Sequence, residues 1–136
     1  MKILLVDDNK ITAIGLKKIV STHSPSTTIY SVENGKKALD FLFEIENKSD
    51  LPDLILLDIN MPVMSGIEML EIKKQNDILF KIPIVIHTTS SDKNDFLKCQ
   101  ELGINGYFIK NIDYKIYKKN IILIIDYWLK SLKYNI

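Results

Sequence analysis

The chain has 136 residues, the length of one domain, and 46% of them are hydrophobic, which is enough to form a buried core. The formal charge of +1 gives no overall attraction to nucleic acid or to anionic membranes. Every basic side chain other than histidine is lysine. Without arginine, the residue that reads bases and clamps phosphates, DNA binding is not expected.

Short apolar or β-branched runs alternate with longer segments of helical spacing along the chain. The runs predict strands over residues 3–6, 28–32, 54–57, 84–88 and 106–109. The intervening segments predict five helices: about 10–20, a stretch after Asn34-Gly35 that includes residues 38–45, a stretch from Ser65-Gly66 that includes residues 67–72, about 93–102, and from after Asp113 to about Leu132.

Apolar side chains at helical intervals predict which helix faces turn toward the core. In the first helix Ile11, Ile14 and Ile19 fall on one side, and in the fourth helix Phe96, Leu97 and Cys99 do so. Cys99 is the single cysteine, so it excludes an internal disulfide and fits a reducing compartment. No signal peptide is expected before the first strand, and residues 121–125, the longest apolar run, are too few to span a bilayer, so we expect a cytoplasmic protein.

Five strand–helix units in series predict an α/β fold, a doubly wound five-stranded parallel sheet with helices on both faces. No linker or repeat divides the chain, so residues 1–136 are expected to form a single domain with no output domain. Functional sites on such sheets lie at the carboxyl ends of the strands.

Polar residues stand at the predicted strand ends. Asp7 and Asp8 close the first run, Asp58 closes the third, and Thr88 and Lys110 close the last two. Carboxylates at close range repel one another by several kcal/mol unless a cation lies among them. Because no cysteine or histidine competes and carboxylate oxygens are hard ligands, the cation that fits is Mg²⁺.

Each of these residues also has an ordinary structural explanation. Acids after a strand aid solubility, Asp58 suits a turn before Pro62, Thr88 lies in a region rich in helix caps, and Lys110 could simply be solvated. Tyr107 could be a packed strand aromatic. Because all of these residues fall at one end of a single predicted sheet, a shared chemical role is favoured over these separate structural explanations.

Four segments together resemble the receiver domain of bacterial two-component response regulators, over nearly the whole chain. They are Val6-Asp7-Asp8-Asn9, Leu57-Asp58-Ile59-Asn60-Met61-Pro62 with Ser65-Gly66, Ile82-Pro83-Ile84-Val85-Ile86-His87-Thr88, and Gly103-Ile104-Asn105-Gly106-Tyr107-Phe108-Ile109-Lys110. The resemblance implies a flavodoxin-like fold with strand order 2-1-3-4-5. Segment 82–91 and Asp126-Tyr127-Trp128-Leu129 further resemble the stand-alone regulators that partner bacterial phytochromes.

The resemblance also implies residue roles. Asp58 accepts a phosphoryl group from a histidine kinase or phosphotransfer protein, and the chain catalyses only its own phosphorylation and dephosphorylation. The implied roles of the other residues are Mg²⁺ binding by Asp7, Asp8, Asp58 and the Asn60 backbone carbonyl, phosphoryl binding by Lys110 and Thr88, switching by Thr88 and Tyr107, and tuning of hydrolysis by Asn60 and Ser90.

One departure from the pattern of the family and two alternative functions stay open. The family has a proline with a cis peptide bond after the lysine, whereas this chain has Asn111. A cis bond without proline costs about 2.5–4 kcal/mol, so the bond is either trans with a rearranged loop or held cis at that cost. The alternatives are an interaction module that is not phosphorylated, and a phosphohydrolase, which would need an acid where Asn60 stands.

The last helix carries two apolar stripes. The first predicts the core contact and comprises Tyr117, Ile121, Ile124, Ile125, Trp128 and Leu132, and the second comprises Ile116, Asn120, Leu123 and Tyr127. The second stripe either packs under neighbouring loops or forms an exposed patch. We expect a homodimer through this patch.

Overall fold

The structure, a computed structural model, describes residues 1–131. Its strands are β1 (Lys2–Val6), β2 (Thr28–Val32), β3 (Leu54–Leu57), β4 (Ile84–Thr88) and β5 (Gly106–Ile109). Its helices are α1 (Lys10–His23), α2 (Gly35–Phe43), α3 (Gly66–Lys74), α4 (Lys93–Glu101) and α5 (Tyr114–Lys130), with short 3₁₀ turns η1 (Lys48–Asp50) and η2 (Leu79–Lys81). Leu132, which the sequence places in the last helix and its stripe, lies outside the described residues.

The five strands form one parallel sheet in the order β2-β1-β3-β4-β5, as predicted. The central strands are apolar throughout because parallel sheets are covered on both faces. All four residues of β3 are buried, and β1 pairs with it from Ile3 opposite Leu54 to Val6 opposite Leu57. This register brings the residues that follow Val6 and Leu57 to the same edge.

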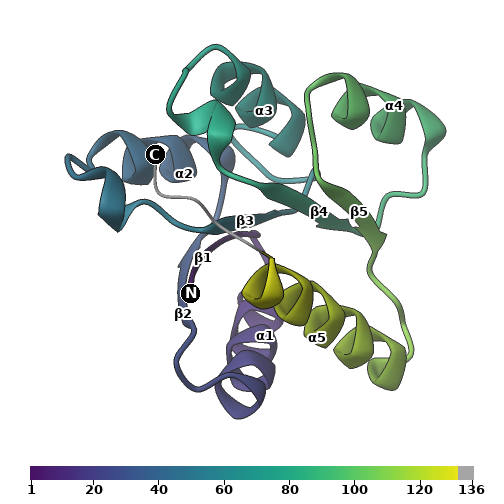
Figure 1. The fold of residues 1–136 in the computed structure, drawn as a ribbon. Helices are drawn as coiled ribbons and strands as arrows, with labels where there is room; N and C mark the ends of the chain where they lie inside the picture. The colour runs from purple at the N-terminus through teal and green to yellow at the C-terminus, as the bar shows by residue number, and fades with distance from the viewer. Residues whose placement is uncertain (132–136) are drawn as a thin grey trace.

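Helices cover both faces of the sheet, so the protein has three layers (Figure 1). Alternating strand side chains divide the core into two parts. Leu4 and Val6 pack with α2, α3 and α4, whereas Ile3 and Leu5 pack with α1 and α5. None of the helices within residues 1–131 is long and apolar enough to cross a membrane.

Each helix starts just past the carboxyl end of a strand, where a polar side chain caps it. Asn9 accepts hydrogen bonds from the backbone amides of Ile11 and Thr12 at the start of α1. The corresponding caps of the other four helices are Asn34, Ser65, Asp92 and Asp113. The caps therefore set the loops that surround the carboxyl edge of the sheet.

The predicted face of the first helix is wrong. Ile11 and Ile14 are 82% and 69% exposed, because the core contact uses the arc through Leu16, Ile19 and Val20. Only Ile19 of the predicted set is buried. The helix also continues three residues past Val20, to His23, whose Nε2 lies 2.7 Å from Asp126 Oδ1.

Two other helices also differ from the sequence prediction. α2 ends at Phe43, so Ile45 lies beyond it. In α4, which ends one residue earlier than predicted, Cys99 is buried, but Phe96 and Leu97 are 37% and 41% exposed. A short helix at the edge of the sheet buries only a narrow stripe, and in α4 that stripe runs through Cys99.

Two glycines give opposite predictions for substitution by alanine. A Cβ on Gly66 would lie 2.4 Å from the Asp58 carbonyl oxygen, whereas a Cβ on Gly15 would meet nothing within 4 Å. Gly66→Ala should therefore lower the free energy of unfolding by about 1–3 kcal/mol. Gly15→Ala should raise it by about 0.5–1 kcal/mol, because alanine favours a helix interior. Urea unfolding measures both, and equal effects would contradict the packing at Gly66.

Candidate functional site

Three carboxylates meet at the carboxyl edge of the sheet. Asp7 follows β1 and Asp58 follows the adjacent β3, and both are buried, at 6% and 7% exposure. Asp8 is exposed beside them. Each of the three residues offers an oxygen within 4.8 Å of the other two. The structure thus brings together the three acids that the sequence singles out.

Lys110 lies between the two buried acids. Its Nζ donates to Asp7 Oδ2 at 2.8 Å and to Asp58 Oδ2 at 3.1 Å. The Lys110–Asn111 peptide bond is trans, like every peptide bond that the structure describes. The Lys110 amide continues the strand ladder by donating to the Thr88 carbonyl at 2.7 Å. The lysine therefore reaches the acids without the cis bond that we considered from the sequence.

The loop after Lys110 holds itself in place without proline. The Asn111 side chain accepts a hydrogen bond from the Asp113 amide at 2.9 Å, and Asp113 in turn caps α5. A side-chain turn of this kind replaces a rigid ring with a local hydrogen bond. The path from β5 to α5 is thereby fixed on both sides of Asn111.

Backbone amides hold the other oxygen of each buried carboxylate. Asp7 Oδ1 accepts from the Asn9 amide at 2.9 Å, and Asp58 Oδ1 accepts from the Asn60 amide at 3.3 Å. Each acid thus uses one oxygen for its own loop and the other for Lys110. This arrangement sets the direction in which both carboxylates point.

Burial and charge oppose each other within the cluster. Burial raises the pKa of the Asp7 carboxyl, and the nearby Asp58 charge adds to that rise while Lys110 counteracts it. Burial disfavours the charge on Lys110, but the hydrogen bond to Asp7 and the charges of Asp7 and Asp58 prevail, so the pKa of Lys110 is raised. Lys110 therefore stays protonated as the counter-charge of the site.

The loop after β4 carries the predicted hydroxyl and switch residues. Thr88 is fully buried, and its Oγ1 accepts from the Ser90 amide at 3.2 Å. The Tyr107 hydroxyl donates to the Ser90 carbonyl at 3.0 Å, while the Tyr107 ring meets Phe96 edge-to-face at 5.3 Å. The position of Tyr107 is therefore tied to the loop that contains Thr88.

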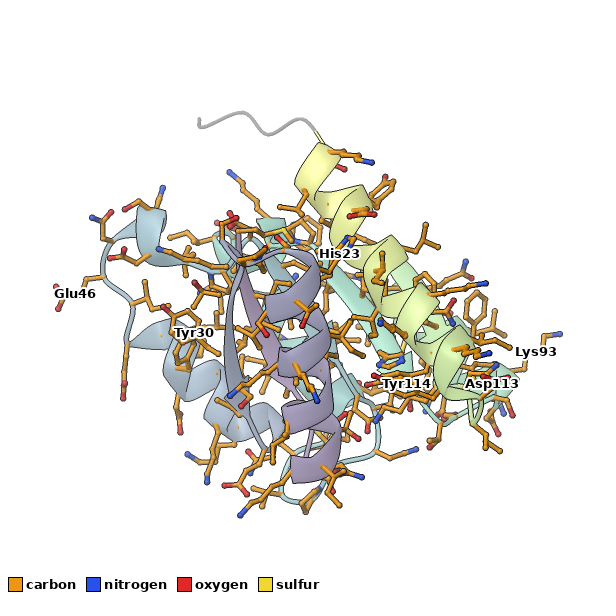
Figure 2. The ribbon with its side chains drawn as sticks, turned by 90° about the horizontal axis from the view of Figure 1, so that it is seen from below. His23, Tyr30, Glu46, Lys93, Asp113 and Tyr114 are labelled. Atoms are coloured by element: carbon orange, nitrogen blue, oxygen red, sulfur yellow. The ribbon has the colours of Figure 1, made fainter. Side chains whose placement is uncertain are left out.

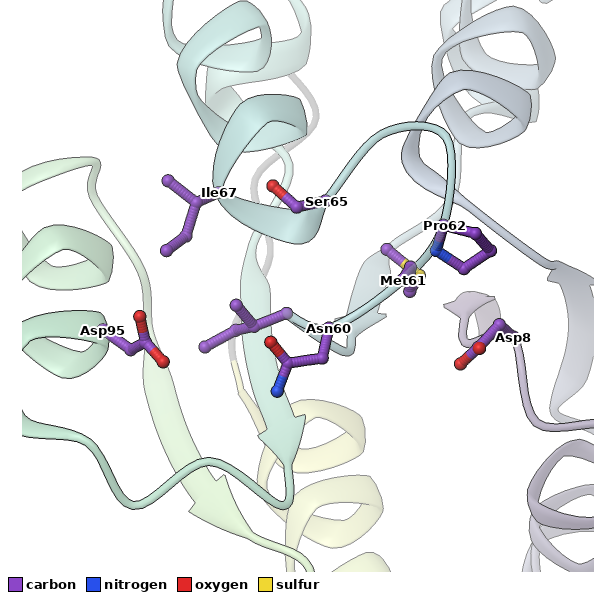
Figure 3. A pocket seen from close by; sticks show the side chains of 8 residues that line it. Asp8, Asn60, Met61, Pro62, Ser65, Ile67 and Asp95 are labelled. Carbon is purple, nitrogen blue, oxygen red and sulfur yellow. The ribbon is translucent and has the colours of Figure 1, made fainter.

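A cavity of about 500 Å³ opens beside the acids (Figure 3). Asp8, Asn60 and Asp95 line it, and the Asn60 side chain lies between the two acids in this view. Asp95 Oδ2 accepts from the Ser90 hydroxyl at 2.6 Å. The sequence shows Asp95 only as an acid in the first turn of a helix, so no sequence signal indicated that it lines this cavity.

His87 is a second residue whose setting the sequence analysis missed. It is 2% exposed, and its Nε2 is the one buried side-chain nitrogen or oxygen without a hydrogen-bond partner among residues 1–131. Its ring lies 5.3 Å from that of Tyr117 on α5. Burial, helped by the charge of Lys110, lowers the pKa of His87 to about 4. Strand alternation could have shown that His87 faces the opposite side of the sheet from Thr88.

The cluster fits a divalent cation. Its donors are carboxylate oxygens, which hard cations such as Mg²⁺ prefer, and their spacing allows all three to contact one ion. The cluster holds three acids against the one ammonium that bridges two of them. One Lys110 charge leaves the group with excess negative charge that a cation would neutralise.

Comparison with known proteins agrees with the fold and identifies the family. Residues 3–121 match the model of the response regulator receiver domain. Response regulator Rcp1 from Synechocystis is 36% identical over 132 residues, covering 95% of this chain and 89% of Rcp1. The chain belongs to the response regulator receiver family, and receiver domains of this family act in two-component phosphorelay signalling.

Solved structures give the same result. The Mn²⁺-bound form of Rcp1 superimposes with a TM-score of 0.87 at 32% identity and covers 99% of both chains. The phosphorylated cyanobacterial phytochrome response regulator RcpA superimposes with a TM-score of 0.88 at 28% identity, covering 97% of this chain and 96% of RcpA. A further sequence relative is longer than this chain. The transcriptional regulatory protein YdfI of Bacillus subtilis is 39% identical over 111 residues, but this chain spans about half the length of YdfI, 48%.

The buried, uncharged His87 predicts a pH dependence of stability. Its folded pKa of about 4 lies below the unfolded value of 6.5, so the unfolded state binds the proton first as the pH falls. Stability is therefore lost from pH 6.5 downward, by about 2 kcal/mol at pH 5. In urea unfolding, His87→Leu should gain about that much over the wild type between pH 7.5 and pH 5. Parallel pH profiles of the two proteins would contradict this.

Proposed function

We propose that Asp58 is the phosphoacceptor of this receiver. The observation that carries the proposal is that Asp58 directly follows the central strand β3, with one oxygen on Lys110, two more acids within reach and a cavity lined by Asp8 and Asn60 next to it. A carboxylate oxygen of Asp58 attacks the phosphorus, the bond from phosphorus to the donor breaks, and an acyl phosphate forms. The donor is a histidine kinase or a phosphotransfer protein.

Asp7, Asp8 and Asp58 would hold Mg²⁺ together with the backbone carbonyl of Asn60. When bound, Mg²⁺ neutralises charge on the carboxylate and the phosphoryl oxygens that would otherwise repel. The hydrogen bonds from the Asn9 and Asn60 amides to Asp7 and Asp58 keep the remaining carboxylate oxygens directed at one place. Orientation of this kind is the chain's own contribution to catalysis.

Lys110 and Thr88 would bind the transferred group. Lys110 already bridges Asp7 and Asp58, so a new phosphoryl oxygen would take over one of its hydrogen bonds. The Thr88 hydroxyl would turn toward the same group and release the Ser90 amide. Because Tyr107 is bound to the Ser90 carbonyl, movement of this loop would be transmitted to Tyr107.

Asn60 and Ser90 would set how long the phosphoryl group survives. The Ser90 hydroxyl is held by Asp95 at 2.6 Å, so it is not free to orient an attacking water. Asn60 brings an amide and no carboxylate, so it supplies no general base. The acyl phosphate is therefore expected to last minutes or longer. The same absence of an acid at position 60 disfavours the phosphohydrolase alternative.

Phosphorylation can be tested directly with acetyl phosphate and Mg²⁺. Intact-mass spectrometry should show one added phosphoryl group, which hydroxylamine removes, and none when Mg²⁺ is chelated. Asp58→Asn should abolish the labelling with its urea unfolding still cooperative. A wild type that stays unlabelled would support the interaction-module alternative, and full labelling of Asp58→Asn at another residue would overturn the assignment of Asp58.

We further propose that the receiver forms a homodimer through α5. The second stripe does not pack under loops, since Ile116, Leu123 and Tyr127 are 44%, 58% and 62% exposed. Leu123 and Tyr127 also line a cavity of about 370 Å³ between α5 and the edge strand β5. An exposed apolar patch beside an unpaired sheet edge is a site for association.

Sedimentation velocity at high concentration tests the dimer. The wild type should sediment as a dimer, and more completely after phosphorylation of Asp58. Leu123→Glu should be monomeric and still accept phosphate, because Leu123 is 58% exposed on the second stripe of α5 and is not part of the carboxylate cluster. The matched control is Ile78→Glu, which introduces the same charge at an apolar side chain that is 45% exposed and lies outside α5. This variant should remain dimeric. A wild type that is monomeric in both states would refute the dimer.

A further inference from the structure

Ser90 uses its amide, its carbonyl and its hydroxyl to fix the loop between β4 and α4. The amide donates to Thr88 Oγ1 at 3.2 Å, and the carbonyl accepts from the Tyr107 hydroxyl at 3.0 Å. The hydroxyl donates to Asp95 Oδ2 at 2.6 Å and accepts from the Asp92 amide at 3.3 Å. Ser90 therefore connects Thr88 and Tyr107 to the first turn of α4.

The hydrogen bond to Asp95 is the shortest that Ser90 makes, and its acceptor is charged. A hydroxyl bonded to a carboxylate is held roughly twice as strongly as in a neutral pair. Asp95 forms no ion pair with a lysine or histidine among the residues that the structure describes. It lies in the first turn of α4 beside Lys93, which Figure 2 shows on the same side of the molecule as the start of α5 at Asp113.

Helix capping does not account for the position of the Asp95 side chain. The cap of α4 is Asp92, whose side chain already accepts from two amides of the first turn. In α3 the corresponding first-turn acid, Glu68, accepts from the hydroxyl of the cap itself, Ser65, at 3.4 Å. Asp95 instead reaches past its cap to Ser90. Its carboxylate therefore fixes the loop before α4 and not the end of the helix.

α4 also contacts the Tyr107 ring directly. Phe96, the residue after Asp95, meets this ring edge-to-face at 5.3 Å. Burial raises the pKa of the Tyr107 hydroxyl, and nearby charges that include Asp95 add to the rise, while the hydrogen bond to Ser90 counteracts it. The hydroxyl therefore keeps the proton that it donates to the Ser90 carbonyl. Tyr107 is thus held by α4 at its ring and by the Ser90 loop at its hydroxyl.

A phosphoryl group on Asp58 would act on Asp95 through its charge. Asp95 and Asp8 line the same cavity of about 500 Å³, with Asn60 between them in Figure 3. Asp8 belongs to the cluster of Asp58, so charge added to that cluster acts across this cavity. A phosphoryl group brings further negative charge, which is unfavourable beside a carboxylate. Phosphorylation should therefore weaken the arrangement in which Ser90 and Asp95 are bonded beside the cavity.

We propose that Asp95 is a positioning residue for phosphorylation, because its hydrogen bond to Ser90 keeps the Thr88 hydroxyl in the place that it occupies before the phosphoryl group arrives. This inference rests on the proposed phosphorylation of Asp58, in which Thr88 turns to the phosphoryl group and releases the Ser90 amide. Asp95 opposes that release. A weaker bond to Ser90 should therefore populate the turned form in advance and tighten binding of a phosphoryl group.

Variants of the two bonded residues test the proposal with beryllofluoride, a phosphoryl analogue. Asp95→Asn removes the charge, Ser90→Ala removes the donor, and Ser90→Thr retains the hydroxyl. Glu68→Gln is the matched control, since it removes the charge of the corresponding acid in α3, whose serine partner belongs to the loop after β3. Calorimetry with Mg²⁺ present gives the Kd of beryllofluoride. Fluorine NMR of fluorotyrosine-labelled protein reports the position of Tyr107, whose signal Tyr107→Phe identifies.

Asp95→Asn and Ser90→Ala should each bind beryllofluoride about five-fold or more tightly than the wild type. Their double variant should bind no more tightly than Asp95→Asn, because both changes act on one bond. Without beryllofluoride, the Tyr107 signal of both single variants should lie closer to that of the beryllofluoride-bound wild type. Ser90→Thr and Glu68→Gln should match the wild type in the Kd and in this signal.

Three results would overturn the proposal. They are an unchanged or weaker affinity of Asp95→Asn, fully additive gains in the double variant, and an equal gain in Glu68→Gln, which would show that loss of any first-turn acid is enough. A wild type that neither binds beryllofluoride nor is labelled by acetyl phosphate would instead count against the phosphorylation of Asp58, and this inference would fall with it.

Discussion

The site depends on one electrostatic constraint, the repulsion among Asp7, Asp8 and Asp58. Two of these acids are buried, and the sheet register fixes their separation, so they cannot move apart. Lys110 offsets part of the repulsion through hydrogen bonds of 2.8 and 3.1 Å. A carboxylate cluster whose repulsion is only partly offset binds cations, and the bound cations attract phosphoryl groups. The same constraint thus links stability, metal binding and phosphorylation.

The fold supplies this constraint by bringing together residues that are distant in sequence. Lys110 arrives from the edge strand β5, more than 50 residues beyond Asp58 and 103 beyond Asp7. Its neighbour Thr88 is tied through Ser90 to Tyr107 and to Asp95. A change at Asp58 therefore has a short path to α4 and β5. On the other face of the sheet, His87 and Tyr117 provide ring contact between β4 and α5.

The alternation of apolar runs with helical segments predicted the parallel sheet and placed the acids at strand ends. The adjacency of β1 and β3, which brings the three acids together, followed from the strand order that the family resemblance implies. The face of α1 could not be predicted in the same way, because Ile11 and Ile14 compete with Leu16 and Val20 for the core and periodicity does not rank two apolar arcs. The path of the loop after Lys110 depends on a side-chain turn at Asn111, and the position of Asp95 depends on how α4 packs. The turn at Asn111 is a local hydrogen bond that the sequence allows but does not require, whereas the helix face of α1 and the position of Asp95 arise from tertiary contacts that a single sequence does not display.

Urea unfolding of Lys110→Ala with and without Mg²⁺ tests the charge balance most directly. Without metal, the variant should lose about 3 kcal/mol or more, because Asp7 and Asp58 are left buried and unpaired. Saturating Mg²⁺ should stabilise the variant more than the wild type, since the metal then replaces the missing counter-charge. A variant as stable as the wild type without metal, or an equal gain from Mg²⁺ in both proteins, would contradict the account.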